Sequence, residues 1–196
     1  DWKLTIDGAC LHPTELDWET FMALPQSDDV SDFHCVTTWS KFDVPWRGVR
    51  FAELMALVSP DDGATHAMCH AYDGYTTNVS LAEAMKPDVL LVHHALGAPL
   101  PIEHGGPIRM ITPQLYAWKG AKWISRIELL TSDRAGVWEE RGYSMTAPPW
   151  RDDRSSPVVP PPARAPASVP PHPAAHIPPT PPPTAVLLPS RLPPTY

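Results

Sequence analysis

The sequence predicts an α+β domain that is built on a mainly antiparallel, partly barrel-like sheet with short helices. Two observations predict this class. Short apolar or alternating runs bounded by Gly, Pro and Asp, which are typical of strands, outnumber the helical patterns. Turns rather than long helices join these runs, and short turns connect antiparallel neighbours. We therefore expect few helices, each of them short, set between the strands.

The chain opens with a strand that is followed by a helix. Residues 1–8 (DWKLTIDG) alternate apolar and polar side chains and end in Asp-Gly, as a half-buried strand does when it enters a tight turn. Residues 16–25 (LDWETFMALP) carry three large apolar side chains on one helical face. Asp17 is suited to cap this helix at its N-terminus, and Pro25 ends it.

Two further stretches predict short helices. In residues 50–60 (RFAELMALVSP), Leu54, Leu57 and Val58 recur at helical spacing and are expected on the buried face. Residues 80–88 (SLAEAMKPD) begin with a serine and carry a glutamate three residues later. This pair is the capping-box signature of a helix N-terminus.

The remaining strands are expected in runs that are apolar or alternating and are bounded by turn-forming residues. The first of these runs continues into a loop and contains a cysteine. The runs are residues 32–48, 65–75, 88–100, 106–113 and 121–130.

Proline content divides the chain of 196 residues into two segments. More than half of its 27 prolines lie in residues 155–196, which contain no Asp or Glu. Such a segment cannot form a helix or an inner strand, because proline fixes φ and removes a hydrogen-bond donor. We expect a domain over residues 1–152 and a proline-rich disordered tail over residues 153–196. The Pro-x-x-Pro stretches of the tail are either ligands for a proline-binding module or parts of a passive segment.

Composition argues against several classes of function. The formal net charge of −7 disfavours binding of nucleic acid through general electrostatics, which requires a basic face. No GxGxxG or Walker motif is present, and no apolar run approaches the roughly 18 residues of a membrane span. The three cysteines show no paired spacing, which favours a reducing compartment over a disulfide framework. We therefore expect no nucleic-acid partner, no membrane span and a cytoplasmic location.

Residues 103–123 (EHGGPIRMITPQLYAWKGAKW) contain the strongest signal for a ligand. They gather His104, Arg109, Lys119 and Lys122 around a Gly-Gly-Pro turn, in a chain that is acidic. Glycines let backbone N–H groups approach a ligand closely, and the planar guanidinium of arginine suits a phosphate. The stretch indicates an anion site. The alternative is a row of cations on a solvated strand edge.

Cys35 lies between His34 and a Trp-Ser-Lys run, where an expected strand enters a loop. A cysteine in such a place is most often a small core residue. The other interpretation is a thiol that carries chemistry. The residues around Cys35 leave both interpretations open.

Four separated blocks resemble the molybdopterin-binding domain of the sulfite oxidase family, in the same order and at the same spacing. They are DFHCVTTWSKFDVPWRGV, YDGYTTNVSL, GAPLPIEHGGPIRMITPQLYAWKGAKWISRIEL and GVWEERGY. The likeness is greatest to the short bacterial group called sulfite-oxidase-like oxidoreductases, and it covers about residues 1–152. It implies the sulfite-oxidase molybdopterin-binding fold and a molybdenum–molybdopterin cofactor.

The resemblance implies roles for the residues of these blocks. Cys35 stands where the family has its single protein ligand to molybdenum, and a thiolate is a soft donor that suits a metal already bound by sulfur. His104 and Arg109 stand where the family contacts the pterin and its phosphate. Lys119 and Lys122 stand where it adds cationic or backbone contacts to the same end.

Two further blocks add candidates by resemblance. Asp73, Thr76 and Thr77 fall where the family lines the pterin cleft, and one of the two threonines is the expected hydroxyl donor. Tyr143 matches a tyrosine close to the metal, where a phenol can hydrogen-bond an oxo group or relay a proton. Its alternative is a tyrosine packed at the domain edge. We thus expect Cys35 and Tyr143 as the catalytic residues.

The implied activity is that of a molybdopterin-dependent oxidoreductase. We expect two-electron oxygen-atom transfer on a small oxyanion or sulfoxide-type substrate, with electrons passed to a separate carrier. Two alternatives stay open, a methionine-sulfoxide-type reductase and a cofactor-binding module that is active only with a partner protein. The C-terminal immunoglobulin-like domain of sulfite-oxidising members has no counterpart in the sequence, which argues against sulfite as the substrate.

Overall fold

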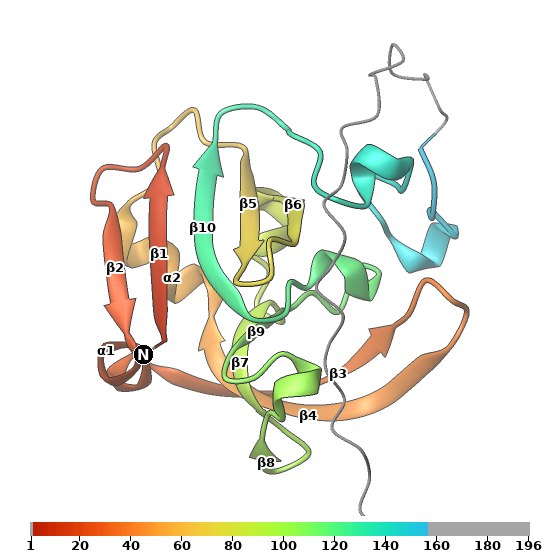
Figure 1. Ribbon diagram of the computed structural model, residues 1–196, viewed down its shortest axis with the longest axis horizontal. Coiled ribbons are helices and arrows are strands. Elements are labelled where there is room, and N and C mark those ends of the chain that lie inside the picture. Colours follow the sequence, from red (N-terminus) through yellow and green to blue (C-terminus); the bar gives the residue numbers. More distant parts are fainter. Residues whose placement is uncertain (1, 157–196) are drawn as a thin grey trace, which may run out of the picture. The chain divides into compact units, whose positions relative to one another are not determined.

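The computed structural model describes residues 2–156, which form two β-sheets with three short α-helices (Figure 1). The tail expected over residues 153–196 lies outside the described residues, except for residues 153–156. No helix in the described part is long and apolar enough to cross a membrane. The strands are β1 (Lys3–Gly8), β2 (Thr14–Asp17), β3 (Gln26–His34), β4 (Ser40–Arg50), β5 (His66–Ala71), β6 (Thr76–Ser80), β7 (Leu90–Ala95), β8 (Ala98–Pro99), β9 (Arg109–Ile111) and β10 (Ile124–Leu130). The helices are α1 (Trp18–Ala23), α2 (Phe51–Val58) and α3 (Leu81–Ala84), and the 3-10 turns are η1 (Ile102–His104), η2 (Ala117–Lys119), η3 (Glu139–Arg141) and η4 (Pro149–Arg151).

The first sheet has the strand order β2-β1-β10-β5-β6. β1 runs parallel to β10, with Ile6 opposite Ile127, whereas the other three pairs are antiparallel. Figure 1 shows β10 between β1 and β5. The first and last strands of the described chain are therefore neighbours.

The second sheet has the order β3-β4-β7-β8, and β9 also pairs with β7. All of its pairs are antiparallel. β3 and β4 form a long curved hairpin (Figure 1). The turn between them begins at Cys35. The pairing of β4 with β7 shifts register at Gly48, where a β-carbon would lie 2.1 Å from the carbonyl oxygen of Leu91. The close approach of these two strands therefore requires glycine.

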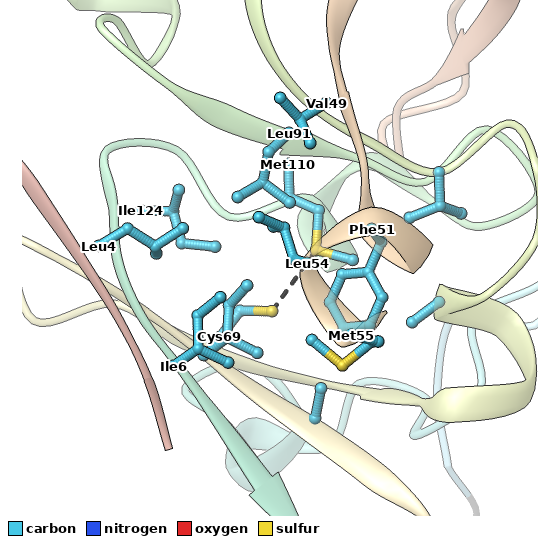
Figure 2. Close-up of a cluster of buried hydrophobic side chains, with 14 of the residues drawn as sticks. Leu4, Ile6, Val49, Phe51, Leu54, Met55, Cys69, Leu91, Met110 and Ile124 are labelled. Atoms are coloured by element: carbon cyan, nitrogen blue, oxygen red, sulfur yellow. Dashed lines mark hydrogen bonds between the residues drawn. The ribbon is translucent and has the colours of Figure 1, made fainter. Parts of the chain in front are cut away.

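The main hydrophobic core joins the two sheets and α2 (Figure 2). Cys69 of the first sheet is fully buried there, and its thiol donates to the sulfur of Met110 in the second sheet at 3.5 Å. Burial raises the pKa of this thiol to about 12, so Cys69 is an unreactive core residue. The residues labelled with them in Figure 2 are Leu4, Ile6, Val49, Phe51, Leu54, Met55, Leu91 and Ile124.

The α+β class with mainly antiparallel strands is confirmed. The sequence predicts a partly barrel-like sheet, and the strands of residues 2–156 form two sheets, neither of which closes into a barrel. The first sheet ends at β2 and β6, and the path of the second ends at β3 and β8. In residues 2–156, β2 does not pair with β6, and β3 does not pair with β8, so both sheets are open.

Two of the helices begin where the sequence predicts. The Asp17 side chain accepts a hydrogen bond from the N–H of Thr20 at 2.8 Å and so caps α1. The Ser80 hydroxyl accepts one from the N–H of Glu83 at 3.3 Å and caps α3. A capping side chain therefore determines where α1 begins and where α3 begins.

The buried face of α2 differs from the prediction. Leu54 and Val58 are buried as expected, but Leu57 is 39% exposed. Phe51 and Met55 complete the buried face instead. These four residues follow the i, i+3, i+4, i+7 spacing of a helix that packs on one side.

Candidate cofactor site

Cys35 is the first residue of the turn that joins β3 to β4. Its N–H donates to the Trp39 carbonyl at 2.9 Å, and its own carbonyl accepts from the N–H of Thr38 at 3.2 Å. Thr38 adopts a left-handed conformation with φ 78°. The Cys35 sulfur is half-buried and lies 3.1 Å from the Thr37 hydroxyl. Unlike Cys69, this thiol is held outside the hydrophobic core.

A cavity of about 520 Å³ lies beside Cys35. Asp73 reaches it from the turn between β5 and β6, and His104 from the end of η1. Arg109 lines it from the start of β9, and Lys122 from the segment before β10. Residues from separate segments of the chain thus share one cavity. The rest of its lining is largely aromatic and consists of Phe33, Val36, Trp39, Tyr75, Ala117, Trp118, Gly120, Trp123 and Trp138.

Arg109 is a buried cation at this cavity, with 7% of the residue exposed. Its Nη1 and Nη2 atoms donate to the carbonyls of His104 at 3.1 Å and Gly120 at 3.4 Å, and its guanidinium lies 5.1 Å from the centre of the Phe33 ring. Its Nε has no hydrogen-bond partner among residues 2–156. No carboxylate in the described part of the chain forms an ion pair with Arg109. Burial therefore lowers its pKa to about 10, and a bound anion would supply the missing negative charge.

Lys122 adds a second cation beside Arg109. Its Nζ donates to the Glu103 carbonyl at 3.0 Å and lies 4.3 Å from the centre of the Trp123 ring. Burial and then the charge of Arg109 lower its pKa, whereas Asp73 opposes the shift. The two cations therefore repel each other, and an anion between them would relieve the repulsion.

Gly105 allows these two cationic residues to approach. Its φ of 103° is one that residues with side chains rarely adopt. A β-carbon at this position would lie 2.9 Å from the Cβ of Lys122 and 3.0 Å from the Cβ of Arg109. The Gly-Gly-Pro turn of the sequence thus serves close packing at the cationic end of the cavity.

Lys119 and Thr77 lie inside the protein rather than on this cavity. Lys119 is fully buried, and its Nζ lies 2.8 Å from Glu139 Oε1 and donates to Asn78 Oδ1 at 2.7 Å. The same Glu139 oxygen accepts hydrogen bonds from the Thr77 hydroxyl and from the Trp118 indole, both at 3.0 Å. Lys119 instead lines a second cavity, of about 410 Å³. Trp118 connects this buried network to the wall of the cavity beside Cys35.

Tyr143 and Thr76 lie one layer behind the cavity wall. The Tyr143 ring packs against Trp118 and Trp138, with ring centres 5.2 Å and 5.0 Å apart. Both tryptophans line the cavity. The carbonyl of Thr76 accepts a hydrogen bond from the N–H of Val137 at 2.9 Å. Tyr143 therefore contacts the wall of the cavity, and Thr76 contacts the segment that precedes Trp138.

Sequence reasoning missed Arg154, which binds the turn that carries Cys35. Its Nη1 donates to the Val36 carbonyl at 2.5 Å, and its Nε donates to Asp152 at 2.5 Å. Its guanidinium also lies 5.4 Å from the centre of the Tyr116 ring. Arg154 follows the last recognisable block of the sequence, so no motif identifies it. Glu139 was also missed, although it lies within the block GVWEERGY.

Comparison with known proteins gives one family and several bacterial relatives. Residues 1–138 match the family described as Oxidoreductase molybdopterin binding domain. The chain is 37% identical over 153 residues to the uncharacterized oxidoreductase YuiH of Bacillus subtilis, covering 78% of this chain and 77% of YuiH. It is 31% identical over 174 residues to the protein-methionine-sulfoxide reductase catalytic subunit MsrP of Gluconobacter oxydans, covering 77% of this chain and 55% of MsrP.

Among solved structures, the fold resembles the sulfane dehydrogenase SoxCD from Paracoccus pantotrophus. The TM-score is 0.64 at 18% sequence identity, over 72% of this chain and 40% of that one. The chain thus spans about half the length of MsrP and less than half of the SoxCD chain.

Proposed function

The chain belongs to the oxidoreductase molybdopterin binding domain family, and we propose that it catalyses two-electron oxygen-atom transfer on a small oxyanion or sulfoxide-type substrate. Family membership makes the chain a molybdopterin-binding oxidoreductase domain. The observation that carries the finer proposal is the cavity itself, which joins the Cys35 thiol to the buried, unpaired Arg109. A thiol and an anion site in one cavity suit a sulfur-bound metal on a phosphate-bearing cofactor.

The residues of the cavity fit this cofactor. The Nε of Arg109, buried without a partner among residues 2–156, is the kind of donor that a phosphate satisfies. Cys35 would hold the molybdenum, and Arg109, His104 and Lys122 would hold the pterin and its phosphate. Asp73, in the turn between β5 and β6, would contact the pterin. When bound, the cofactor supplies the two-electron redox chemistry at molybdenum.

The chain's own residues shape the site around that chemistry. Trp118 and Trp138 form an aromatic wall of the cavity. We assign Tyr143, which packs on both, the role of holding or moving a proton at its phenol oxygen. Thr77 and Lys119 would act through Glu139, because this carboxylate fixes the Trp118 indole.

A methionine-sulfoxide-type reductase is the second candidate function. The sequence similarity to the methionine-sulfoxide reductase subunit MsrP supports this candidate, although the chain spans only 55% of MsrP. A cavity that opens to solvent is also suited to a substrate carried on another molecule, and Trp39 at its edge is 52% exposed. The third candidate is a cofactor-binding module that is active only with a partner protein.

We also propose a separate electron carrier and a cytoplasmic location. The half-exposed thiol turn gives a carrier access to the site. The three cysteines are free, which is the usual state in a reducing compartment.

The test of the cofactor proposal is Cys35→Ser in protein expressed in a host that makes molybdopterin. A hydroxyl is a poor replacement for a thiolate ligand, so we expect dye-linked turnover to be lost and the molybdenum spectrum to change. Pterin bound through Arg109 should remain in part. Cys10→Ser, at a half-buried cysteine outside the cavity, is the matched control and should keep both signals. An unchanged spectrum with full activity in Cys35→Ser would refute the assignment.

Substrate assays with an artificial electron carrier separate the candidate functions. Reduction of methionine sulfoxide identifies the reductase, and turnover of other small oxyanions or sulfoxides identifies the broader oxygen-atom transferase. A loaded protein that turns over neither, until a partner protein is added, identifies the module.

A further inference from the structure

A third, much smaller cavity lies behind the wall of the cavity beside Cys35. Its volume is about 10 Å³, the smallest size that holds one water molecule. Phe33, Ala117 and Gly120 line both cavities and therefore separate them. The smaller cavity is also lined by Asp32, His34, Trp46, Met110, Ile111, Thr112, Pro113 and Leu115.

Three residues that line this cavity each have a buried polar side-chain atom without a hydrogen-bond partner among residues 2–156. These atoms are Nε2 of His34, Nε1 of Trp46 and Oγ1 of Thr112. The three residues are only 6%, 8% and 6% exposed, so bulk solvent does not satisfy these atoms. Buried polar groups in native proteins nearly always have a partner. Three such atoms around one cavity of water size point to a single missing partner.

We propose that this cavity is a binding site for one internal water molecule. The Trp46 indole can only donate, so the water oxygen accepts from it. The water then donates its two hydrogens to Thr112 Oγ1 and to His34 Nε2, in the tautomer whose Nδ1–H donates to the Ser40 hydroxyl at 2.8 Å. Three hydrogen bonds are the usual number for a buried water. One water therefore satisfies all three groups.

The position of this water gives it a structural role at the site. His34 is the last residue of β3 and immediately precedes Cys35. Thr112 directly follows β9, which begins at Arg109. Trp46 lies on β4, the other strand of the Cys35 hairpin. The water thus connects the element that carries the thiol to the element that carries the buried cation.

The first test is a crystal structure of the full chain loaded with its cofactor. We expect one ordered water within hydrogen-bond distance of His34 Nε2, Trp46 Nε1 and Thr112 Oγ1. A dry cavity, or side chains turned towards other partners, would overturn the proposal. Because this readout does not depend on activity, its failure is distinct from failure of the proposed function.

The second test measures the water in solution by NMR. The indole N–H of Trp46 should show a nuclear Overhauser effect to water with the sign of a molecule that tumbles with the protein. Thr112→Val removes one of the three partners at nearly constant shape and should weaken the effect, whereas Thr112→Ser should retain it. An absent effect at wild-type Trp46, or an equal effect in Thr112→Val, would refute the site.

Discussion

Arg109 combines a full charge with burial and has no carboxylate partner in the described part of the chain. A cation in that position is poorly solvated, so the protein gains from any anion that reaches it. The two carbonyls that accept from Arg109 hold the guanidinium in place but leave its charge uncompensated. The buried, uncompensated charge of Arg109 therefore favours binding of an anionic group of the cofactor.

The first prediction concerns this charge. Arg109→Ala should lower cofactor affinity roughly ten- to hundred-fold, because a charge-assisted contact contributes about 1.5–3 kcal/mol. Arg109→Lys should recover only part of the lost cofactor affinity, because an ammonium group keeps the positive charge but lacks the planar, two-pronged donor geometry of a guanidinium. Occupancy is measured by releasing the pterin, oxidising it to a fluorescent derivative and normalising to protein. Arg134→Ala, at an exposed cation paired with Glu128, is the control, and equal occupancy in Arg109→Ala would contradict the prediction.

The second prediction concerns His93, whose pKa is lowered to about 4 by burial, by His94 and by Arg47, in that order. The ordinary pKa of histidine is 6.5, so between these two values the unfolded chain binds a proton that the folded protein does not. Stability should therefore fall as the pH decreases from about 6.5 towards 4. His93→Gln should flatten this part of the profile. The check is the Tm of both proteins across that range, and parallel profiles would contradict the prediction.

The two lysines of one sequence block show why residue types do not determine a site. Lys119 and Lys122 lie three positions apart in the same run of aromatics and glycines, and both are predicted from the sequence to lie at the anion end. In the structure Lys122 lines the cavity, whereas Lys119 lies in η2 and is neutralised by Glu139. The direction of each side chain depends on how η2 turns into β10, and spacing alone cannot show that.

At the scale of elements, strands with alternating apolar residues and helices with capping residues could be predicted. β6 (Thr76–Ser80) was missed because its sequence, TTNVS, is short and polar. Its residues are nevertheless partly or fully buried, since β5 and the Gly136–Val137 segment cover its backbone. The parallel pairing of β1 with β10 was not predicted either, because it depends on contacts between strands far apart in the sequence.

The third prediction belongs to the contact between β4 and β7. Gly48→Ala would place a β-carbon 2.1 Å from the Leu91 oxygen and 2.6 Å from Val92 Cα, both of them backbone atoms. The strands must then separate, and we expect a loss of about 1–3 kcal/mol of unfolding free energy. Gly63→Ala is the matched control, because its nearest neighbour would be Thr131 Cγ2 at 3.9 Å. Denaturant unfolding checks both, and equal stabilities would contradict the prediction.

At the scale of the whole molecule, the motif blocks do not extend to the end of the packed chain. The resemblance ends near residue 152, yet the next residues contact the domain. Asp153 accepts hydrogen bonds from the hydroxyls of Ser144 at 2.6 Å and Thr146 at 2.7 Å. Arg154 reaches the carbonyl of Val36 beside Cys35.

The last prediction compares two shortened chains. A chain that ends at residue 156 should keep its Tm and its cofactor occupancy, because it retains all of these contacts. A chain that ends at residue 152 should lose about 1–3 kcal/mol, because the hydroxyls of Ser144 and Thr146 lose their hydrogen bonds to the charged Asp153, and it should bind less cofactor. Thermal unfolding and pterin content measure the two effects. Equal behaviour of the two chains would show that Asp153 and Arg154 contribute nothing.

The bond from Arg154 to Val36 also has a consequence for biosynthesis. Cys35 leaves the ribosome early, but the residue that fastens its turn is translated only after β10, the partner of the first strand, has been made. A nascent chain therefore carries the Cys35 thiol, the proposed metal ligand, long before the turn around it has its final hydrogen bonds. We expect cofactor insertion to be a late event that follows release of nearly the whole domain, and an interrupted translation product to remain unable to retain molybdenum.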